Sequence, residues 1–169
     1  MADTKQKADG SKHVKPTNIL SRSLFTGFIG GLIWSICGVI FYYFNFSEVA
    51  PRTFELRSWL RTEWTDSWLG DVISIFGAGV LSVVTAFIYY GVFKKIKSWW
   101  FGAIFGVVLW VIIFYVLHPI FGNVPSLGQM SNHTIVSTIC LFVLYGTFIG
   151  YSISYDYYDT IVKGQAETK

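Results

Sequence analysis

Three side chains with acid–base or metal-ligand chemistry stand at the edges of long apolar stretches: Asp71, His118 and His133. Asp71 opens one apolar stretch, His118 closes the next, and His133 precedes the last. If these stretches are membrane helices, all three side chains lie on the outer face, where a carboxylate and two imidazoles can bind polar groups or exchange protons. We therefore predict a candidate polar cluster there. Each residue also has a simpler interpretation, because an acid is stabilised in the first turn of a helix and a histidine at a membrane edge is solvated.

Other catalytic patterns are absent from the sequence. It contains no H-E-x-x-H, no G-x-x-x-x-G-K-[ST] and no G-x-S-x-G motif, and Cys37 and Cys140 lie far apart without C-x-x-C spacing. We predict no catalytic residues, no metal site and no cofactor, and hence a protein that is not an enzyme. The net charge of +3 is small and unevenly placed, which argues against a nucleic-acid partner.

The apolar residues are grouped in four stretches, at residues 24–44, 71–93, 99–117 and 134–153. Hydrophobic residues make up 53% of the chain and charged residues only 14%. Helices of about 20 apolar residues match a hydrocarbon core roughly 30 Å thick. The sequence therefore predicts an all-α membrane protein with four transmembrane helices and contact with the lipid bilayer.

The connector between the first two stretches has a different composition, with charged residues among tryptophans and leucines. Pro51 suits the first turn of a helix. Leu56, Leu60, Trp64 and Trp68 fall on one helical face, and the opposite, polar face holds Glu55, Ser58, Thr62, Thr65 and Asp66. We predict an interfacial amphipathic helix at about 51–68, with an ordered cap over the bundle as the alternative. Its expected contacts with the interface are Arg57, Trp59, Arg61 and Trp64.

Pairs of glycines four residues apart occur in three of the stretches. The pairs are Gly27 with Gly31, Gly102 with Gly106, and Gly146 with Gly150. Small residues at this spacing let helix backbones approach closely in a membrane. Packing within the bundle is the favoured interpretation, and contact with a membrane protein partner or a second copy is the alternative.

Basic residues predict the orientation. With four spans, one side holds the N-terminal segment, the Lys94–Lys97 turn and the C-terminal segment, whereas the other side holds Arg52, Arg57 and Arg61. The positive-inside rule then places both termini in the cytoplasm and the protein in the plasma membrane. The expected division is a disordered polar tail at 1–19, a transmembrane domain at 20–159 and a polar tail at 160–169.

Several segments resemble one family of membrane proteins. They are the Lys-rich leader, the first span "FTGFIGGLIWS", the connector "RSWLRTEWTDSWLGD" and the turn "KKIKSWW". Together they are similar to the YqhR family of small four-span proteins from Bacillus-type Gram-positive bacteria, over roughly residues 20–159. The resemblance implies a bacterial plasma-membrane location and supplies no activity.

Three functions remain open at this point. The leading hypothesis is a non-enzymatic accessory or interaction protein of the plasma membrane. The first alternative is an oligomeric pore or small-solute transporter, and the second is a lipid-modifying enzyme that uses Asp71, His118 and His133.

Overall fold

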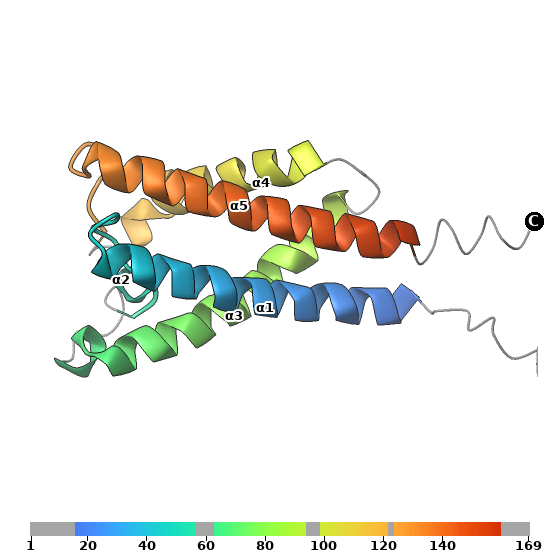
Figure 1. The fold of residues 1–169 in the computed structure, drawn as a ribbon, viewed down its shortest axis with the longest axis horizontal. Coiled ribbons are helices and arrows are strands. Elements are labelled where there is room, and N and C mark those ends of the chain that lie inside the picture. The colour runs from blue at the N-terminus through green and yellow to red at the C-terminus, as the bar shows by residue number, and fades with distance from the viewer. Residues whose placement is uncertain (1–15, 57–62, 94–98, 122–123, 160–169) are drawn as a thin grey trace, which may run out of the picture.

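The computed structural model describes residues 16–56, 63–93, 99–121 and 124–159, and these are helical with no strand (Figure 1). The long helices are α1 (Pro16–Tyr43), α3 (Trp68–Phe93) and α5 (Asn132–Tyr157), and α4 (Trp99–Val111) continues into a π-helical turn, Ile112–Val116. The remaining helical pieces are α2 (Pro51–Glu55) and the 3-10 turns η1 (Glu63–Asp66) and η3 (His118–Ile120). The predicted all-α fold is confirmed.

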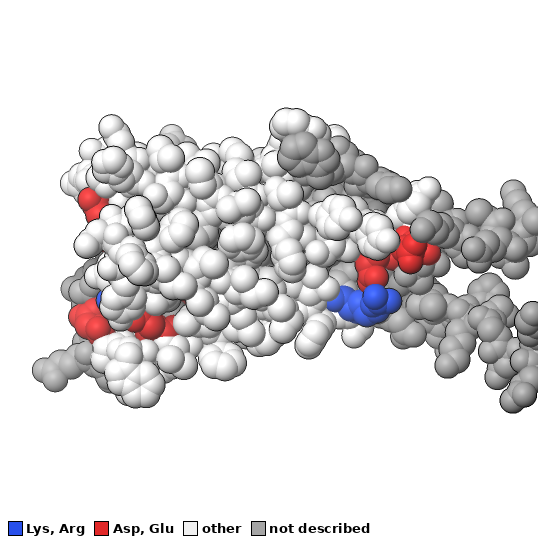
Figure 2. Space-filling model, in the orientation of Figure 1, with Lys and Arg blue, Asp and Glu red and all other residues white. Residues whose placement is uncertain are grey.

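The surface of the helix bundle is suited to a membrane. Three segments are long and apolar enough to cross one, Leu20–Tyr43, Trp68–Phe93 and Asn132–Tyr157, and the apolar segment Trp100–Val116 is shorter. Large apolar side chains point outward, among them Val80 and Phe87 of α3, which are 61% and 58% exposed. Figure 2 shows the charged residues at the two ends of the molecule, with an uncharged belt between them on the face in view.

Polar contacts show which helix ends lie together. Arg22 forms an ion pair of 2.8 Å with Asp156, which joins the start of α1 to the end of α5. At the opposite end, the hydroxyl of Tyr43 donates to Asp71 at 2.9 Å, which joins the end of α1 to the start of α3. We call this second end the connector end, because the segment between α1 and α3 lies there, and the first end the Arg22 end.

Glycines allow α1 to pack closely against α3. A Cβ at Gly27 would overlap Ala86, and a Cβ at Gly31 would overlap Ser82 and approach the carbonyl of Ala78 to 2.8 Å. Gly79 of α3 likewise leaves room for the side chains of Phe28 and Leu32 of α1. Both members of the first predicted pair therefore serve packing within the chain.

The second and third glycine pairs face each other between α4 and α5. A Cβ at Gly102 would lie 2.7 Å from the carbonyl of Gly146, and a Cβ at Gly106 would overlap the carbonyl of Phe142. Gly150 lies against the backbone of Gly102 from the other side. The chain itself therefore occupies the space beside these glycines.

The connector starts with a sharp reversal of the chain. Asn45 has a φ of 59°, in the left-handed region that asparagine tolerates better than most residues, and it ends α1. Pro51 then begins α2 at its first position. The described residues form two short pieces, α2 and η1, where the sequence predicted one helix over 51–68. Residues 57–62, with Arg57, Trp59 and Arg61, lie outside the described ranges, as do residues 1–15, residues 160–169 and the Lys94–Lys97 turn. The first helix begins at Pro16, four residues inside the tail predicted at 1–19.

Candidate binding site

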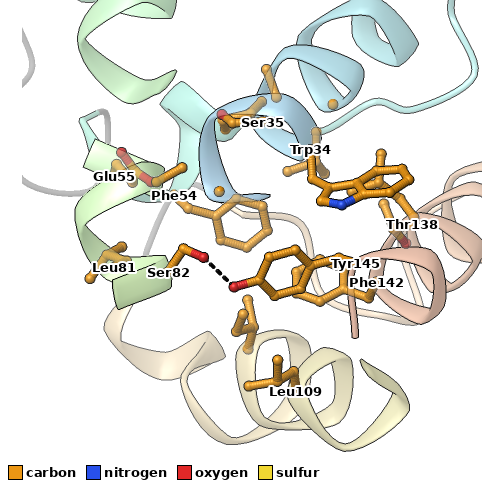
Figure 3. Close-up of a pocket in the computed structure, with 18 of the residues that line it drawn as sticks. Trp34, Ser35, Phe54, Glu55, Leu81, Ser82, Leu109, Thr138, Phe142 and Tyr145 are labelled. Atoms are coloured by element: carbon orange, nitrogen blue, oxygen red, sulfur yellow. Dashed lines mark hydrogen bonds between the residues drawn. The ribbon is translucent and has the colours of Figure 1, made fainter. Parts of the chain in front are cut away.

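A cavity of about 210 Å³ lies inside the bundle beneath α2. It is larger than the cavity of about 150 Å³ that is known to stay dry and bind benzene. Most of the lining is apolar, and the polar groups are few. Figure 3 shows side chains from several segments around it, with labels on Trp34, Ser35, Phe54, Glu55, Leu81, Ser82, Leu109, Thr138, Phe142 and Tyr145.

The cavity reaches the lipid-facing surface. Leu81 of α3 lines it and is 59% exposed, and Leu109 of α4 lines it from the other side. The two helices meet near the Arg22 end, where the rings of Tyr89 and Phe105 pack with their centroids 5.0 Å apart. From there α3 and α4 diverge toward the connector end (Figure 1). Leu81, a lining residue that is exposed, marks the side of the cavity that would face the bilayer.

A buried ion pair holds α2 over the cavity. Nη1 of Arg52 lies 2.8 Å from Oδ2 of Asp71, and both side chains are less than a tenth exposed. The guanidinium also lies over the ring of Tyr42, 4.9 Å from its centroid, in a cation–π contact. Burial alone would lower the pKa of Arg52, but the Asp71 carboxylate and the hydroxyls of Tyr42 and Tyr43 raise it above its usual value. Arg52 therefore stays charged and fixes the start of α2 to the start of α3.

Glu55 sits at the other end of α2 and lines the cavity. A Cβ at Gly77 of α3 would overlap the Oε2 atom of Glu55, so the missing side chain at Gly77 makes room for the carboxyl group. Within the described ranges, Glu55 has no ion-pair or hydrogen-bond partner. Burial raises the pKa of Glu55 to about 8. The sequence placed Glu55 on the polar face of an interfacial helix; the structure corrects this, because Gly77 lets the carboxyl pack against the bundle.

The hydroxyl groups of Ser82, Thr138 and Tyr145 also line the cavity. The hydroxyl of Ser82 donates to the carbonyl of Gly27 at 2.6 Å and is also hydrogen-bonded to the hydroxyl of Tyr145 (Figure 3). Thr138 accepts a hydrogen bond of 3.0 Å from the indole of Trp110. These groups have hydrogen-bond partners within the protein, whereas the hydroxyl of Ser35 and the carboxyl of Glu55 have none among the described residues.

The raised pKa of Glu55 predicts a pH dependence of stability. A carboxyl group with a raised pKa in the folded protein stabilises it most at low pH, and this contribution falls as pH rises from about 4.5 to about 8. The melting temperature in detergent should therefore fall between pH 5 and pH 8 more steeply for the natural protein than for Glu55→Gln. All other titratable groups are the same in both proteins, so the difference between the two curves isolates Glu55. Parallel curves would contradict the prediction.

The predicted outer cluster is divided among different partners. Asp71 binds Arg52 and Tyr43, and its Oδ1 atom has no partner in the described protein. Nε2 of His118 lies 3.1 Å from the carbonyl oxygen of Val124. His133 lines a separate polar hollow of about 680 Å³ at the connector end. Asp71 is in the first turn of α3 as predicted. It is buried beside Arg52, however, and does not face water as the sequence predicted.

The polar hollow connects the end of α1 to the start of α5. It is lined by Tyr42, Tyr43, Asn45, Ser47, Glu48, Ser131 and His133. The backbone N–H of Glu48 donates to the hydroxyl of Thr134 at 3.0 Å, and Ser131 caps α5 by accepting from the N–H of Thr134. Ordinary capping of α5 therefore accounts for the positions of Glu48 and Ser131. Trp64, one of the expected interfacial contacts, lies in η1.

Sequence reasoning missed the two residues of α2 that matter most for the cavity. Arg52 was counted as a charge that reports topology, and Glu55 was assigned to a solvated face. The available signal was the position of both residues in the first turn after Pro51, three apart and hence on one helical face. No group of three or more His, Cys, Asp and Glu side chains in the described ranges could hold a metal ion.

The fold and the cavity define an all-α membrane protein. A family model described as "Conserved membrane protein YqhR" matches residues 3–168, and the chain belongs to this family. A protein of Bacillus subtilis (strain 168), described as "Uncharacterized protein YqhR", is 41% identical over 156 residues, which cover 92% of this chain and 87% of that protein. No solved structure matches the chain. The resemblance predicted from the sequence is therefore confirmed.

Proposed function

We propose that this protein is a non-enzymatic accessory protein of the plasma membrane, and that it acts by binding an apolar or amphiphilic molecule from the bilayer. The observation that carries the proposal is the cavity of about 210 Å³, whose lining is mostly apolar and includes the exposed Leu81 of α3. We infer that the cavity opens to the bilayer beside this residue, between α3 and α4. Ligand sites are typically concave and apolar with a few placed polar groups. Lipid, detergent and other amphiphiles reach such an opening directly from the membrane.

A non-enzymatic role is favoured over a lipid-modifying enzyme by the partners of the three candidate catalytic residues. Asp71 is engaged by Arg52, His118 lies against a backbone carbonyl, and His133 lines another hollow. A pore has less support, because the charged residues of the described spans stand near helix ends, at Arg22, Asp71 and Asp156. Intramembrane charges near the centre are typical of ion paths.

We further propose four spans with both termini in the cytoplasm. The end of α3 packs against α4 at the Arg22 end, with the rings of Phe93 and Phe101 6.4 Å apart, whereas α5 starts at the connector end beside Glu48. The segment from Trp99 to Val116 must therefore run from one end to the other. The sequence places most lysines at the Arg22 end, which is the cytoplasmic side by the positive-inside rule.

Filling the cavity should abolish ligand binding. In Leu109→Trp the larger ring would occupy the space between α3 and α4, and we expect the co-purified ligand to fall at least tenfold. The measurement is native mass spectrometry of the protein released from mild detergent, followed by analysis of the extracted lipids.

Val108→Trp is the matched control, because Val108 is the neighbouring residue on α4, is 46% exposed and does not line the cavity. It should bind ligand as the natural protein does. Equal amounts of the same bound molecules in all three proteins, or none in any of them, would refute the proposed function.

A further inference from the structure

The unpartnered polar groups of the cavity indicate what kind of molecule it takes. We propose that the ligand is an amphiphile with an uncharged hydroxyl head group, and that the Glu55 carboxyl and the Ser35 hydroxyl bind this head group. The inference rests on the proposed function and adds to it the chemical class of the ligand and the residues that select it.

The carboxyl group of Glu55 is held in a fixed place above the cavity. It comes from the short helix over the cavity, and its carboxyl group occupies the space left by the missing side chain of Gly77 on α3. The Arg52–Asp71 ion pair fixes this helix one turn earlier. The carboxyl group therefore has a defined position at the α2 side of a mostly apolar cavity.

The carboxyl group of Glu55 is protonated in these surroundings. The nearest cation on α2, Arg52, is already paired with Asp71, and within the described ranges no other charged group lines the cavity. An isolated charge in apolar surroundings is strongly disfavoured, so the carboxyl group holds its proton. A protonated carboxyl group offers one donor and free acceptor positions.

A ligand hydroxyl group complements the protonated carboxyl group of Glu55. A hydroxyl both donates and accepts, so it pairs with a protonated carboxyl group in both directions without bringing a charge into the cavity. Ser35 lines the same cavity, is 7% exposed, and has a hydroxyl with no hydrogen-bond partner in the described protein. Its oxygen–hydrogen bond can rotate toward a ligand oxygen. A charged head group would have to lose its water at a free-energy penalty that this site does not offset.

The remaining lining suits a hydrocarbon chain. Figure 3 shows the aromatic side chains of Trp34, Phe54 and Phe142 around the cavity, and Leu81 and Leu109 line it as well. A molecule with its hydroxyl at Glu55 would extend its chain past these side chains and out between α3 and α4. Trp34 then lies beside the chain and serves as an optical reporter.

The test uses four probes with twelve-carbon chains and bromine on the sixth carbon, so that the bromine stays inside the cavity: 6-bromo-1-dodecanol, 6-bromododecane, 6-bromododecylammonium and 6-bromododecanoate. Bromine quenches tryptophan fluorescence on contact. The full-length protein is placed in phosphatidylcholine nanodiscs, and the signal of Trp34 is taken as the difference from Trp34→Phe. We expect the alcohol to reach half-quenching at about tenfold lower mole fraction than the alkane, as expected for one or two net hydrogen bonds.

Variants assign this preference to the proposed residues. Glu55→Leu should reduce the alcohol-over-alkane ratio to about one, whereas Glu55→Gln, which keeps a donor and an acceptor, should retain most of it. Ser35→Ala should lower the ratio about threefold. Gly77→Ala should lower it as well, because the added methyl group displaces the carboxyl, and it provides an independent test if Glu55→Leu does not fold.

The outcomes separate this inference from the proposed function. Quenching by the alkane and the alcohol alike, or an alcohol preference that survives Glu55→Leu and Gly77→Ala, would refute head-group recognition but leave a site for apolar molecules. Tightest binding of the ammonium or carboxylate probe would also refute it. If no probe quenches Trp34, both the inference and the proposed function are wrong.

Discussion

Replacing Arg52 with alanine is expected to destabilise the folded protein by about 3 kcal/mol. Breaking a buried ion pair by removing one partner leaves the other charge buried and uncompensated, which typically lowers stability by about 3–5 kcal/mol. Asp71 would be left with the hydroxyl of Tyr43, which cannot neutralise it. We place the effect at the lower end of the range because the pair lies at the end of the bundle, where water is near.

The loss should be largest at the connector end. Arg52 fixes α2, so Arg52→Ala should also release the roof of the cavity and expose Glu55. The free energy of unfolding can be measured by titration with a denaturing detergent, and the accessibility of α2 by limited proteolysis.

Two further variants make the ion-pair prediction specific. The double replacement of Arg52 by Met and Asp71 by Leu removes both charges and should recover most of the stability. Arg22→Ala breaks the pair with Asp156, in which the arginine is 63% exposed, and should change stability by about 0–1 kcal/mol. Equal losses for Arg52→Ala and Arg22→Ala would contradict the assigned role of the buried pair.

Gly106→Leu should disrupt the packing of α4 on α5 and lower stability by about 3 kcal/mol. The new side chain would overlap the carbonyl of Phe142 and approach the Cα of Val143 to 2.9 Å. Because these neighbours are backbone atoms, the helices must separate, and overpacking of this kind typically lowers stability by about 1–3 kcal/mol or more.

Gly91→Leu is the matched control on α3. Among the described residues, no neighbouring atom lies within 4 Å of a Cβ at Gly91, so the leucine would face open space. Leucine favours helix over glycine by roughly 0.5–1 kcal/mol, and this variant should be unchanged or slightly more stable. If both leucine variants melt at the same temperature, close backbone packing at Gly106 is not important for stability.

The sequence predicts the class of fold because that information is local. Apolar stretches of about 20 residues and glycines four apart need no knowledge of distant contacts, and the long helices and the packing at Gly27, Gly106 and Gly146 follow from them. The choice of neighbours does not follow. Nothing in the spacing of Gly102 and Gly106 specifies that they meet α5 and not α1.

The candidate site depends on contacts that the pattern does not contain. Arg52 and Asp71 are 19 residues apart in the sequence. They are buried together because the chain reverses at Asn45 and α2 packs against α3. The carboxyl of Glu55 turns inward because Gly77 has no side chain. In a helical projection Glu55 falls on the polar face, opposite the leucines and tryptophans, and this separation predicts an interfacial helix.

The most direct test of the binding cavity is photocross-linking in living cells. A photoreactive amino acid is placed at Leu109, which lines the cavity, or at Val108, which faces the lipid, and the adducts are identified by mass spectrometry. The proposed function predicts an adduct of one defined mass at position 109 and a mixture of bulk membrane lipids at position 108. The same mixture of bulk lipids at both positions would contradict it.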